Sequence, residues 1–353
     1  MRFALVTSTL LLVTSIILII FFTTIFRFWR NKTDAKKLAY RQNLRELLVK
    51  FLSEDLNPGE LSSLRKIRSS QLEELSDALL SKVKGRAKDM LISFLASRGT
   101  IEKAINRTRR PGYVGRCRAA VFLGNIGLPE ARMPLQNMLT DHRRDVRITA
   151  ARSLGQLANP KSVPALLSAL DHSHREVPFG TVLLALLRIG AGGITPLREG
   201  LKNGGESTRA LAAEVLGLIG SLESTADLID IMQNDTSVDV RIRSARALGR
   251  LGSEKAILPL RRIFEEDSPA PLQVVSCRAL ADIGDPVAIP WLMDLMDHGS
   301  YQLARAASAA MANLGERGEE ALRNSLSLNS IGSNYAQEAL VRMHARSLRD
   351  TRG

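Results

Sequence analysis

Residues 145–155 read DVRITAARSLG and residues 239–249 read DVRIRSARALG, so one pattern occurs twice in the chain. In both copies a pair of small residues stands in the middle, and another small residue follows the last leucine. Apolar and small residues at this spacing predict an amphipathic helix. The paired small residues would let a neighbouring helix approach closely.

The last small residue of the pattern recurs with a nearly constant period. Its gaps are 31, 62, 32, 32 and 31 residues, and its members are Gly124, Gly155, Gly217, Gly249, Ala281 and Ala312. A second series three residues later has no gap outside 30–32 residues, and it consists of Gly127, Ala158, Gly190, Gly220, Gly252, Gly284 and Gly315. Such self-similarity is typical of stacked repeats. The chain therefore carries about seven copies of one unit.

Each unit is predicted to contain two helices. The second series supplies the left-handed position after the first helix. A proline, whose missing N–H costs nothing in a first turn, opens the second helix or lies in its first turn at Pro134, Pro164, Pro196, Pro259 and Pro290. One helix pair cannot bury its apolar face alone, so we expect the copies to stack into a right-handed, all-α solenoid with one continuous core.

The two stretches quoted first resemble HEAT repeats of the short, phycobilisome-lyase-like type (PBS lyase HEAT-like). The resemblance covers about residues 112–330. It implies an armadillo-type α-solenoid and a protein-binding scaffold, although a few similar proteins are enzymes. The third unit departs from the pattern because Pro178 stands where an arginine is expected. There we expect the first helix to gain one residue and the solenoid to bend or to form a local surface feature.

The amino-terminal region has the composition of a membrane anchor. Residues 3–26 contain no charged side chain. As a helix they would span about 36 Å, more than the roughly 30 Å of a hydrocarbon core. The run lacks the small-residue cleavage site of a signal peptide and ends at Arg27. We therefore expect an uncleaved single span that contacts membrane lipid.

The flank of this run predicts its orientation. Residues 1–111 hold 21 Lys and Arg against 10 Asp and Glu, whereas residues 112–353 hold 28 against 26. Positive flanks stay on the cytoplasmic side, so the rest of the chain should face the cytoplasm from the inner membrane. The residues expected at the membrane surface are Arg27, Trp29, Arg30, Lys32, Lys36 and Lys37.

The sequence between anchor and repeats has helical period. Apolar stripes at Leu44–Leu52, Leu72–Leu79 and Leu91–Leu95 are separated by glycines and by a break at Asn57–Gly59. We predict an anchor with its basic flank (1–30), a juxtamembrane helical cap (31–111), the solenoid (112–330) and a carboxyl-terminal capping helix and tail (331–353).

Recurring polar residues suggest structure rather than catalysis. One position in four units is occupied by Arg116, Arg147, Arg209 and Arg241. We expect Asp–Arg pairs between adjacent units there; the alternative is a basic ladder for an anionic partner. Asp–His pairs recur at 141–142, 171–172 and 297–298, too far apart in the stack to share a metal. Cys117 and Cys277 are expected to be buried, inert thiols.

A partner-binding surface is expected where the resemblance places the concave face, along the second helices. Exposed candidates there are Arg198, Lys202, Arg261, Arg262, Asp294 and Asp297. The sequence offers no G-x-S-x-G, C-x-x-C or H-E-x-x-H motif and no phosphate-loop frame, so neither catalytic residues nor a cofactor or metal is expected.

The sequence therefore predicts a non-enzymatic, membrane-anchored scaffold for a protein partner. By analogy with bacterial proteins of similar layout, that partner could be an envelope polysaccharide glycosyltransferase. Three alternatives stay open. They are a chromophore lyase-like or other HEAT-type enzyme, a nucleic-acid-binding solenoid (opposed by the near-neutral charge of the repeats), and a scaffold outside the cytoplasmic membrane.

Overall fold

The computed structural model describes residues 18–19, 21–24, 42–53, 55, 57–80, 82–171, 175–266, 268–328 and 330–350. The chain divides into two compact units, unit 1 (Met1–Ala104) and unit 2 (Ile105–Gly353). Every regular element of the described residues is helical, which confirms the all-α prediction.

Unit 1 contains the helices expected before the repeats. They are a helix at residues 42–52, α2 (Pro58–Lys66), α3 (Ser69–Leu80), α4 (Arg86–Ser97) and the first residues of α5 (Thr100–Arg107). Leu48, Leu72 and Leu91, from three predicted stripes, are fully buried. The predicted break at Asn57 is the start of α2, where the Asn57 N–H donates to Glu60 Oε2 over 3.1 Å.

Unit 2 consists of helix pairs. Its first helices are α6 (Tyr113–Ile126), α8 (Arg144–Leu157), α10 (Phe179–Ile189), α12 (Glu206–Ile219), α14 (Val238–Leu251), α16 (Ala270–Ile283) and α18 (Tyr301–Met311). Its second helices are α7 (Arg132–Asn137), α9 (Val163–Ser168), α11 (Ile194–Asn203), α13 (Thr225–Asn234), α15 (Ile257–Glu265), α17 (Ile289–His298) and α19 (Gly315–Ser327). The last helix is α20 (Ser333–Asp350).

Short 3₁₀ turns occur beside the second helices. They are η1 (Pro129–Ala131), η2 (Met138–Thr140), η3 (Pro160–Ser162), η4 (Gly190–Gly193), η5 (Leu222–Ser224), η6 (Glu254–Ala256) and η7 (Pro286–Ala288). As predicted, the recurrent prolines lie in the first turns of the second helices, for example Pro164 in α9 and Pro290 in α17.

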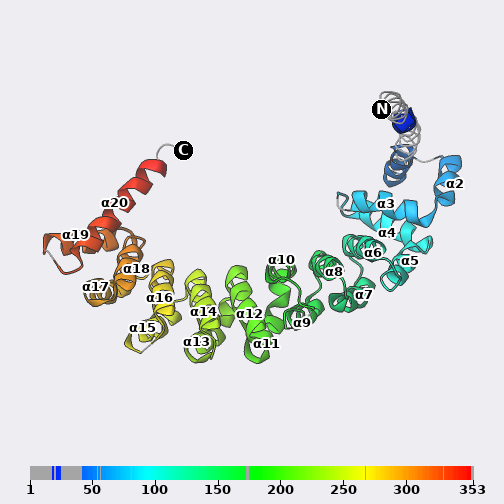
Figure 1. Cartoon of the computed structure of the whole chain (residues 1–353). Helices are drawn as coiled ribbons and strands as arrows, with labels where there is room; N and C mark the ends of the chain where they lie inside the picture. Colours follow the sequence, from blue (N-terminus) through cyan, green and yellow to red (C-terminus); the bar gives the residue numbers. More distant parts are fainter. Residues whose placement is uncertain are drawn as a thin grey trace, which may run out of the picture. The chain divides into compact units, whose positions relative to one another are not determined.

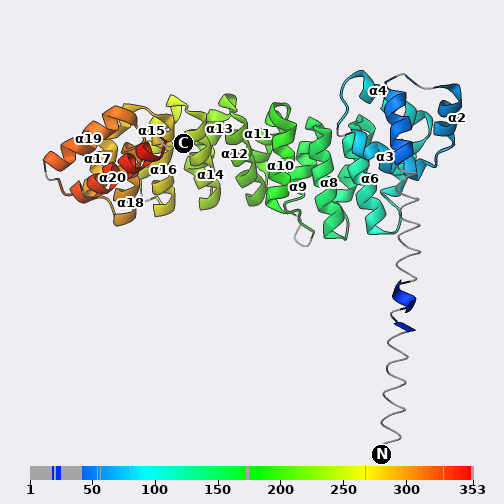
Figure 2. The ribbon, with the colours of Figure 1, turned by 90° about the horizontal axis from the view of Figure 1, so that it is seen from above.

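The helices of unit 2 form two layers. Figure 1 shows the first helices along the inner side of the curve that unit 2 describes and the second helices along its outer side. The view from above in Figure 2 shows the same succession of pairs from α8 to α19. The concave face of unit 2 is thus formed by first helices, which corrects the expectation that the second helices line it.

Close contacts between neighbouring first helices explain the first periodic series. A Cβ atom on Gly124, Gly155, Gly217 or Gly249 would lie within 2.9 Å of a Cα atom on the next first helix. The residues that provide these Cα atoms are Ser153, Ala185, Ala247 and Ala279. Real side chains do not tolerate such distances, so glycine allows this approach.

The second series has the predicted left-handed backbone at five helix ends: Gly127, Ala158, Gly220, Gly252 and Gly284. Ala158, with a φ of 52°, is the one non-glycine residue with positive φ in the described part of the chain. Gly190 and Gly315 also have positive φ, but Gly190 has a ψ of −147° and Gly315 begins α19.

The third unit differs from its prediction. Helix α10 has 11 residues, whereas α8 and α12 have 14, so the first helix is shorter rather than longer. The reason is Pro178, which precedes the helix as its N-cap residue in an extended-like conformation. Contact between α10 and α12 is the sparsest between neighbouring first helices. Leu187 stands there at the position that glycine occupies in α8 and α12.

Candidate binding surface

The recurrent arginines lie at the junctions between units, largely buried. Arg116 Nε lies 2.8 Å from Asp141 Oδ2, and Arg209 contacts both carboxylate oxygens of Asp235 at 2.6 and 2.9 Å. Each of these aspartates lies in the loop that precedes the next first helix. The two pairs therefore link one unit to the start of the next.

The other two arginines of this series bind mainly backbone oxygens. Arg147 donates to the carbonyls of Asp141 and His142 at 2.9 and 3.3 Å and to that of Glu176 at 3.4 Å. Arg241 donates to the Met232 carbonyl over 2.8 Å. All four guanidinium groups are thus engaged inside the solenoid, which leaves little of them for an anionic partner.

Two of the predicted partner-binding residues, Arg198 and Lys202 of α11, are bound to Asp227 of the neighbouring second helix α13. Arg198 Nε lies 2.6 Å from Asp227 Oδ2, and Lys202 Nζ lies 2.7 Å from Oδ1. Burial raises the pKa of Asp227, but hydrogen bonds from Lys202 and Arg198 outweigh this and hold the pKa below its usual value. These residues fasten two outer helices together.

The remaining predicted residues lie on α15 and α17. Arg261 pairs with Glu265 at 2.9 Å and stacks 4.7 Å from the centre of the Trp291 ring. Asp294 pairs with His298 at 3.2 Å, and Asp297 Oδ1 accepts the Gly332 N–H at 2.8 Å just before α20. Arg262 is exposed. The structure gives no single surface to these six residues.

The recurrent aspartates have structural partners where the structure describes them. Asp141 binds Arg116, Asp171 Oδ2 accepts the Thr208 hydroxyl at 2.7 Å, and Asp297 binds Gly332. His172 and His174 lie outside the described residues. Among the residues that are described, no group of three His, Cys, Asp or Glu side chains could hold a metal ion.

The two thiols differ. Cys277 is fully buried, and burial raises its pKa to about 12, so it is protonated at neutral pH. Cys117 is only partly buried, which corrects the prediction for that residue.

A groove of about 650 Å³ crosses three first helices on the inner side of unit 2. Its lining consists of aliphatic residues, which are valines of α16 and alanines of α16 and α18, together with Asn313 and the charged residues Arg246 of α14 and Arg278 and Asp282 of α16. We call the aliphatic residues its floor and the charged residues its rim. We call this site the inner groove. It lies on the concave layer, where the sequence placed no candidate residue.

Exposed arginines recur on the same face. Arg152, Arg246 and Arg278 all stand three residues before the small residue of the first periodic series. Sequence analysis missed them, although aligning the units on that series would have grouped them. They were missed because the binding surface was predicted on the second helices, whereas these arginines lie on the first helices.

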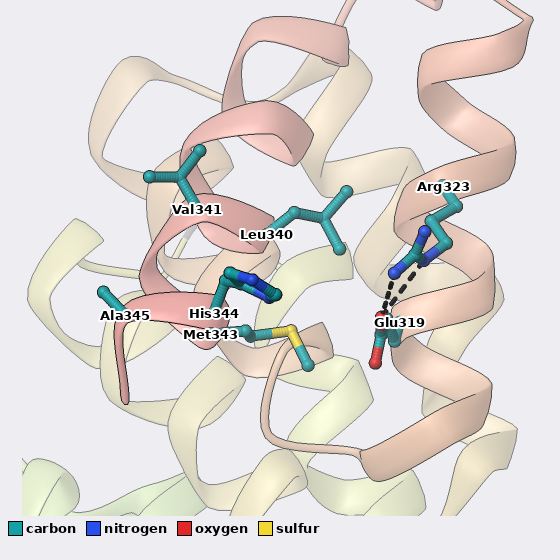
Figure 3. Close-up of a pocket in the computed structure, with 7 residues that line it drawn as sticks. All are labelled: Glu319, Arg323, Leu340, Val341, Met343, His344 and Ala345. Atoms are coloured by element: carbon teal, nitrogen blue, oxygen red, sulfur yellow. Dashed lines mark hydrogen bonds and ion pairs between the residues drawn. The ribbon is translucent and has the colours of Figure 1, made fainter. Parts of the chain in front are cut away.

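A second cavity, of about 600 Å³, lies between α19 and α20 at the carboxyl-terminal end of unit 2. Figure 3 shows Leu340, Met343 and His344 of α20 pointing toward Glu319 and Arg323 of α19, whose closest ion-pair distance is 2.6 Å. The cavity is bounded by one internal ion pair, by His344 and by apolar side chains.

The predicted anchor lies almost entirely outside the described residues, as do Arg27, Trp29, Arg30, Lys32, Lys36 and Lys37. Its described residues, 18–19 and 21–24, are helical and exposed. Within the described part of the chain, one stretch, Phe179–Asn203, is long and apolar enough to cross a membrane. It consists of α10, η4 and α11, whose helices belong to different layers, so it is a helix pair of the solenoid.

Comparison with curated protein sequences gives no match. Among solved structures, the chain is similar to human deoxyhypusine hydroxylase, with 19% identity, 70% of this chain and 98% of that chain covered and a TM-score of 0.32. It is also similar to the CpcE–CpcF complex of phycocyanin lyase from Nostoc sp. PCC7120, with 21% identity, 66% of this chain and 91% of that chain covered and a TM-score of 0.28. The similarity to Kap121p has 13% identity, covers 84% of this chain and 46% of that chain and has a TM-score of 0.44.

Family comparison agrees with the period of the sequence. The family model for HEAT repeats matches residues 101–186 and 194–275, and that for the PBS lyase HEAT-like repeat matches residues 278–298. These matches confirm the predicted resemblance within unit 2 and do not include the amino-terminal anchor. Residues 101–186 and 194–275 therefore contain HEAT repeats, and the α16–α17 pair contains a repeat of the PBS lyase HEAT-like type.

Proposed function

We propose that the protein is a non-enzymatic scaffold, anchored in the cytoplasmic membrane, that binds a protein partner through the concave face of its solenoid. The observation that carries the proposal is the inner groove, an open, continuous surface formed by three successive repeats. Solenoids expose extended concave surfaces of this kind, on which a partner can contact several repeats at once.

The non-enzymatic part of the proposal is supported by the use of the charged residues. The recurrent arginines and aspartates bind each other or backbone groups at the junctions between units. Such residues stabilise the stack and are not available as acids, bases or nucleophiles. The sequence also offers no nucleophile with a base at a recognised spacing.

The membrane part rests on the uncharged run at residues 3–26 and its basic flank. An anchored solenoid would meet membrane-bound partners at a raised effective concentration. A membrane enzyme, such as an envelope polysaccharide glycosyltransferase, is the kind of partner that this arrangement suits.

The test is mild crosslinking of the full-length chain in native membranes, followed by mass spectrometry. A chain lacking residues 1–30 is the matched control. We expect the full chain to capture one membrane protein in stoichiometric amount and the control to lose that capture. Capture of no protein, together with a small molecule that copurifies with unit 2, would overturn the scaffold and favour a lyase-like function.

A further inference from the structure

The inner groove combines an aliphatic floor with basic rims. Val274 and Val275 of α16 and Ala306 and Ala309 of α18 form part of the floor. None of these four side chains is fully buried, so apolar surface remains open to a ligand. Exposed aliphatic side chains of this kind can pack against small or branched side chains of a ligand.

Cations dominate the rim. The carboxylate of Asp282 lies 4.0 Å from Arg278 Nε, which is the limit for an ion pair, and the Arg278 side chain is 80% exposed. Arg246 is exposed on α14, and Arg250 lies one turn beyond it on the same helix. Among the interactions found in the described residues, neither Arg246 nor Arg250 has an acidic partner. The rim therefore carries more positive charge than Asp282 can balance.

We propose that the inner groove binds an extended acidic segment of a protein, whose carboxylates pair with Arg246 and Arg278 while its apolar side chains lie on the valine and alanine floor. This inference rests on the proposed scaffold function and specifies the chemistry of the partner. Complementary charge at such a site selects the partner and speeds its association.

The repeat geometry defines the spacing of the acidic residues. Arg246 and Arg278 occupy equivalent positions in neighbouring repeats, whose helices touch at Gly249 and Ala279. Packed helices lie about 8–10 Å apart. In the extended polyproline II conformation three residues complete one turn and cover about 9 Å, so every third side chain points to the same side. Two carboxylates three residues apart in the segment therefore match Arg246 and Arg278.

Nucleic acid fits the groove less well. The floor of the groove is lined by Val and Ala side chains, so the groove offers no aromatic platform on which bases could stack. The chain from residue 112 onward has 28 basic and 26 acidic residues, too balanced for a surface that follows a phosphate backbone.

The test measures fluorescence anisotropy of a labelled peptide with the full-length protein in mild detergent. The peptide has about a dozen residues with glutamate at every third position and valine or threonine between them. A peptide of the same composition with consecutive glutamates, and a single-stranded DNA of equal charge, are the comparison probes. Each is measured at about 50 and 200 mM salt, where screening differs.

Three variants separate the groove from general charge. Arg246→Glu with Arg278→Glu reverses the rim, and Ala306→Phe fills the floor without a change of charge. Arg262→Glu on the outer helix α15 is the matched control, because Arg262 is also an exposed arginine. Circular dichroism confirms that each variant is folded.

We expect the spaced peptide to bind, and both groove variants to weaken it by at least about tenfold, while Arg262→Glu leaves it unchanged. Equal binding of the clustered peptide, equal loss in Arg262→Glu, or tighter binding of DNA at the same residues would overturn the inference. The crosslinking test separates the two proposals: if Arg246→Glu with Arg278→Glu still captures the membrane partner, the scaffold stands and the groove assignment fails.

Discussion

At the scale of single residues, the close packing of the solenoid depends on glycines, which have no Cβ atom. Gly124, Gly155, Gly217 and Gly249 let neighbouring first helices approach until a Cβ atom would overlap the next backbone. Gly180, near the start of α10, has nothing within 4 Å of its Cβ position. The same substitution should therefore have opposite effects at the two kinds of site.

We expect Gly217→Ala to lower the free energy of unfolding by about 1–3 kcal/mol, because the new methyl group would overlap Ala247 in the next helix. Gly180→Ala should change it by less than about 1 kcal/mol and in the stabilising direction, since alanine favours helix. Urea unfolding followed by circular dichroism measures both. Equal stability of the two variants would show that the close approach is not needed.

The Arg209–Asp235 pair should make stability depend on pH. Burial raises the pKa of Asp235, but hydrogen bonds from Arg209 and the Ser237 N–H outweigh it and hold the pKa below its usual value. The contribution is therefore complete above the unfolded pKa of about 3.9 and is lost as the pH falls through the folded pKa.

Asp235→Asn should cost about 3 kcal/mol at neutral pH, because Arg209 would keep its charge without its partner. The difference from the unchanged protein should shrink below about pH 4. Urea midpoints between neutral and acidic pH measure this. The control is Asp145→Asn in the exposed first turn of α8; the idea fails if both variants show the same pH profile.

At the scale of helices, charged residues that look like binding residues hold elements together. Asp227 joins α13 to Arg198 and Lys202 of α11, and Asp297 joins α17 to the start of α20. Removing such a residue should affect the mobility of one helix rather than the affinity for a partner.

We expect Asp297→Ala to increase hydrogen exchange along the described part of α20 by about five- to tenfold, since one hydrogen bond of about 1 kcal/mol is lost. Asp294→Ala should leave α20 unchanged, because Asp294 is exposed and, in the described part of the chain, pairs with His298 on its own helix. Mass spectrometry of exchanged peptides reports both variants. Unchanged exchange in Asp297→Ala would contradict the role given to this carboxylate.

The helices of unit 2 could be predicted because the same pattern of residues recurs in each repeat. Small residues, prolines and helix-end glycines each marked a position in the pair, and the structure has them there. The inner groove could not be predicted in this way, because a periodic pattern identifies the exposed positions of both helices without saying which layer becomes concave. Helix α10 was predicted too long because Pro178 acts as an N-cap, and a gap in a series cannot distinguish a longer helix from a longer loop.

At the scale of the whole molecule, the proposed anchor makes a simple prediction. The full-length chain should stay in the membrane pellet after alkaline carbonate extraction, and the chain lacking residues 1–30 should be released, because a 24-residue apolar run inserts essentially irreversibly. Proteolysis of sealed inverted vesicles should then digest unit 2 if it faces the cytoplasm. Release of the full-length chain by carbonate would contradict the span.

The glycine contacts also explain why unit 2 bends. They bring neighbouring first helices together at four junctions, so the repeats that carry them are narrower on the first-helix side, and a row of such wedges curves toward its narrow edge. The same contacts set the interval between Arg246 and Arg278, which stand three residues before Gly249 and Ala281. A methyl group added at Gly249 would therefore change the distance between Arg246 and Arg278, and with it the spacing of ligand carboxylates that fits the concave face, although no arginine is altered. In this protein, ligand preference can evolve through the spacing of the repeats as well as through the residues that touch the ligand.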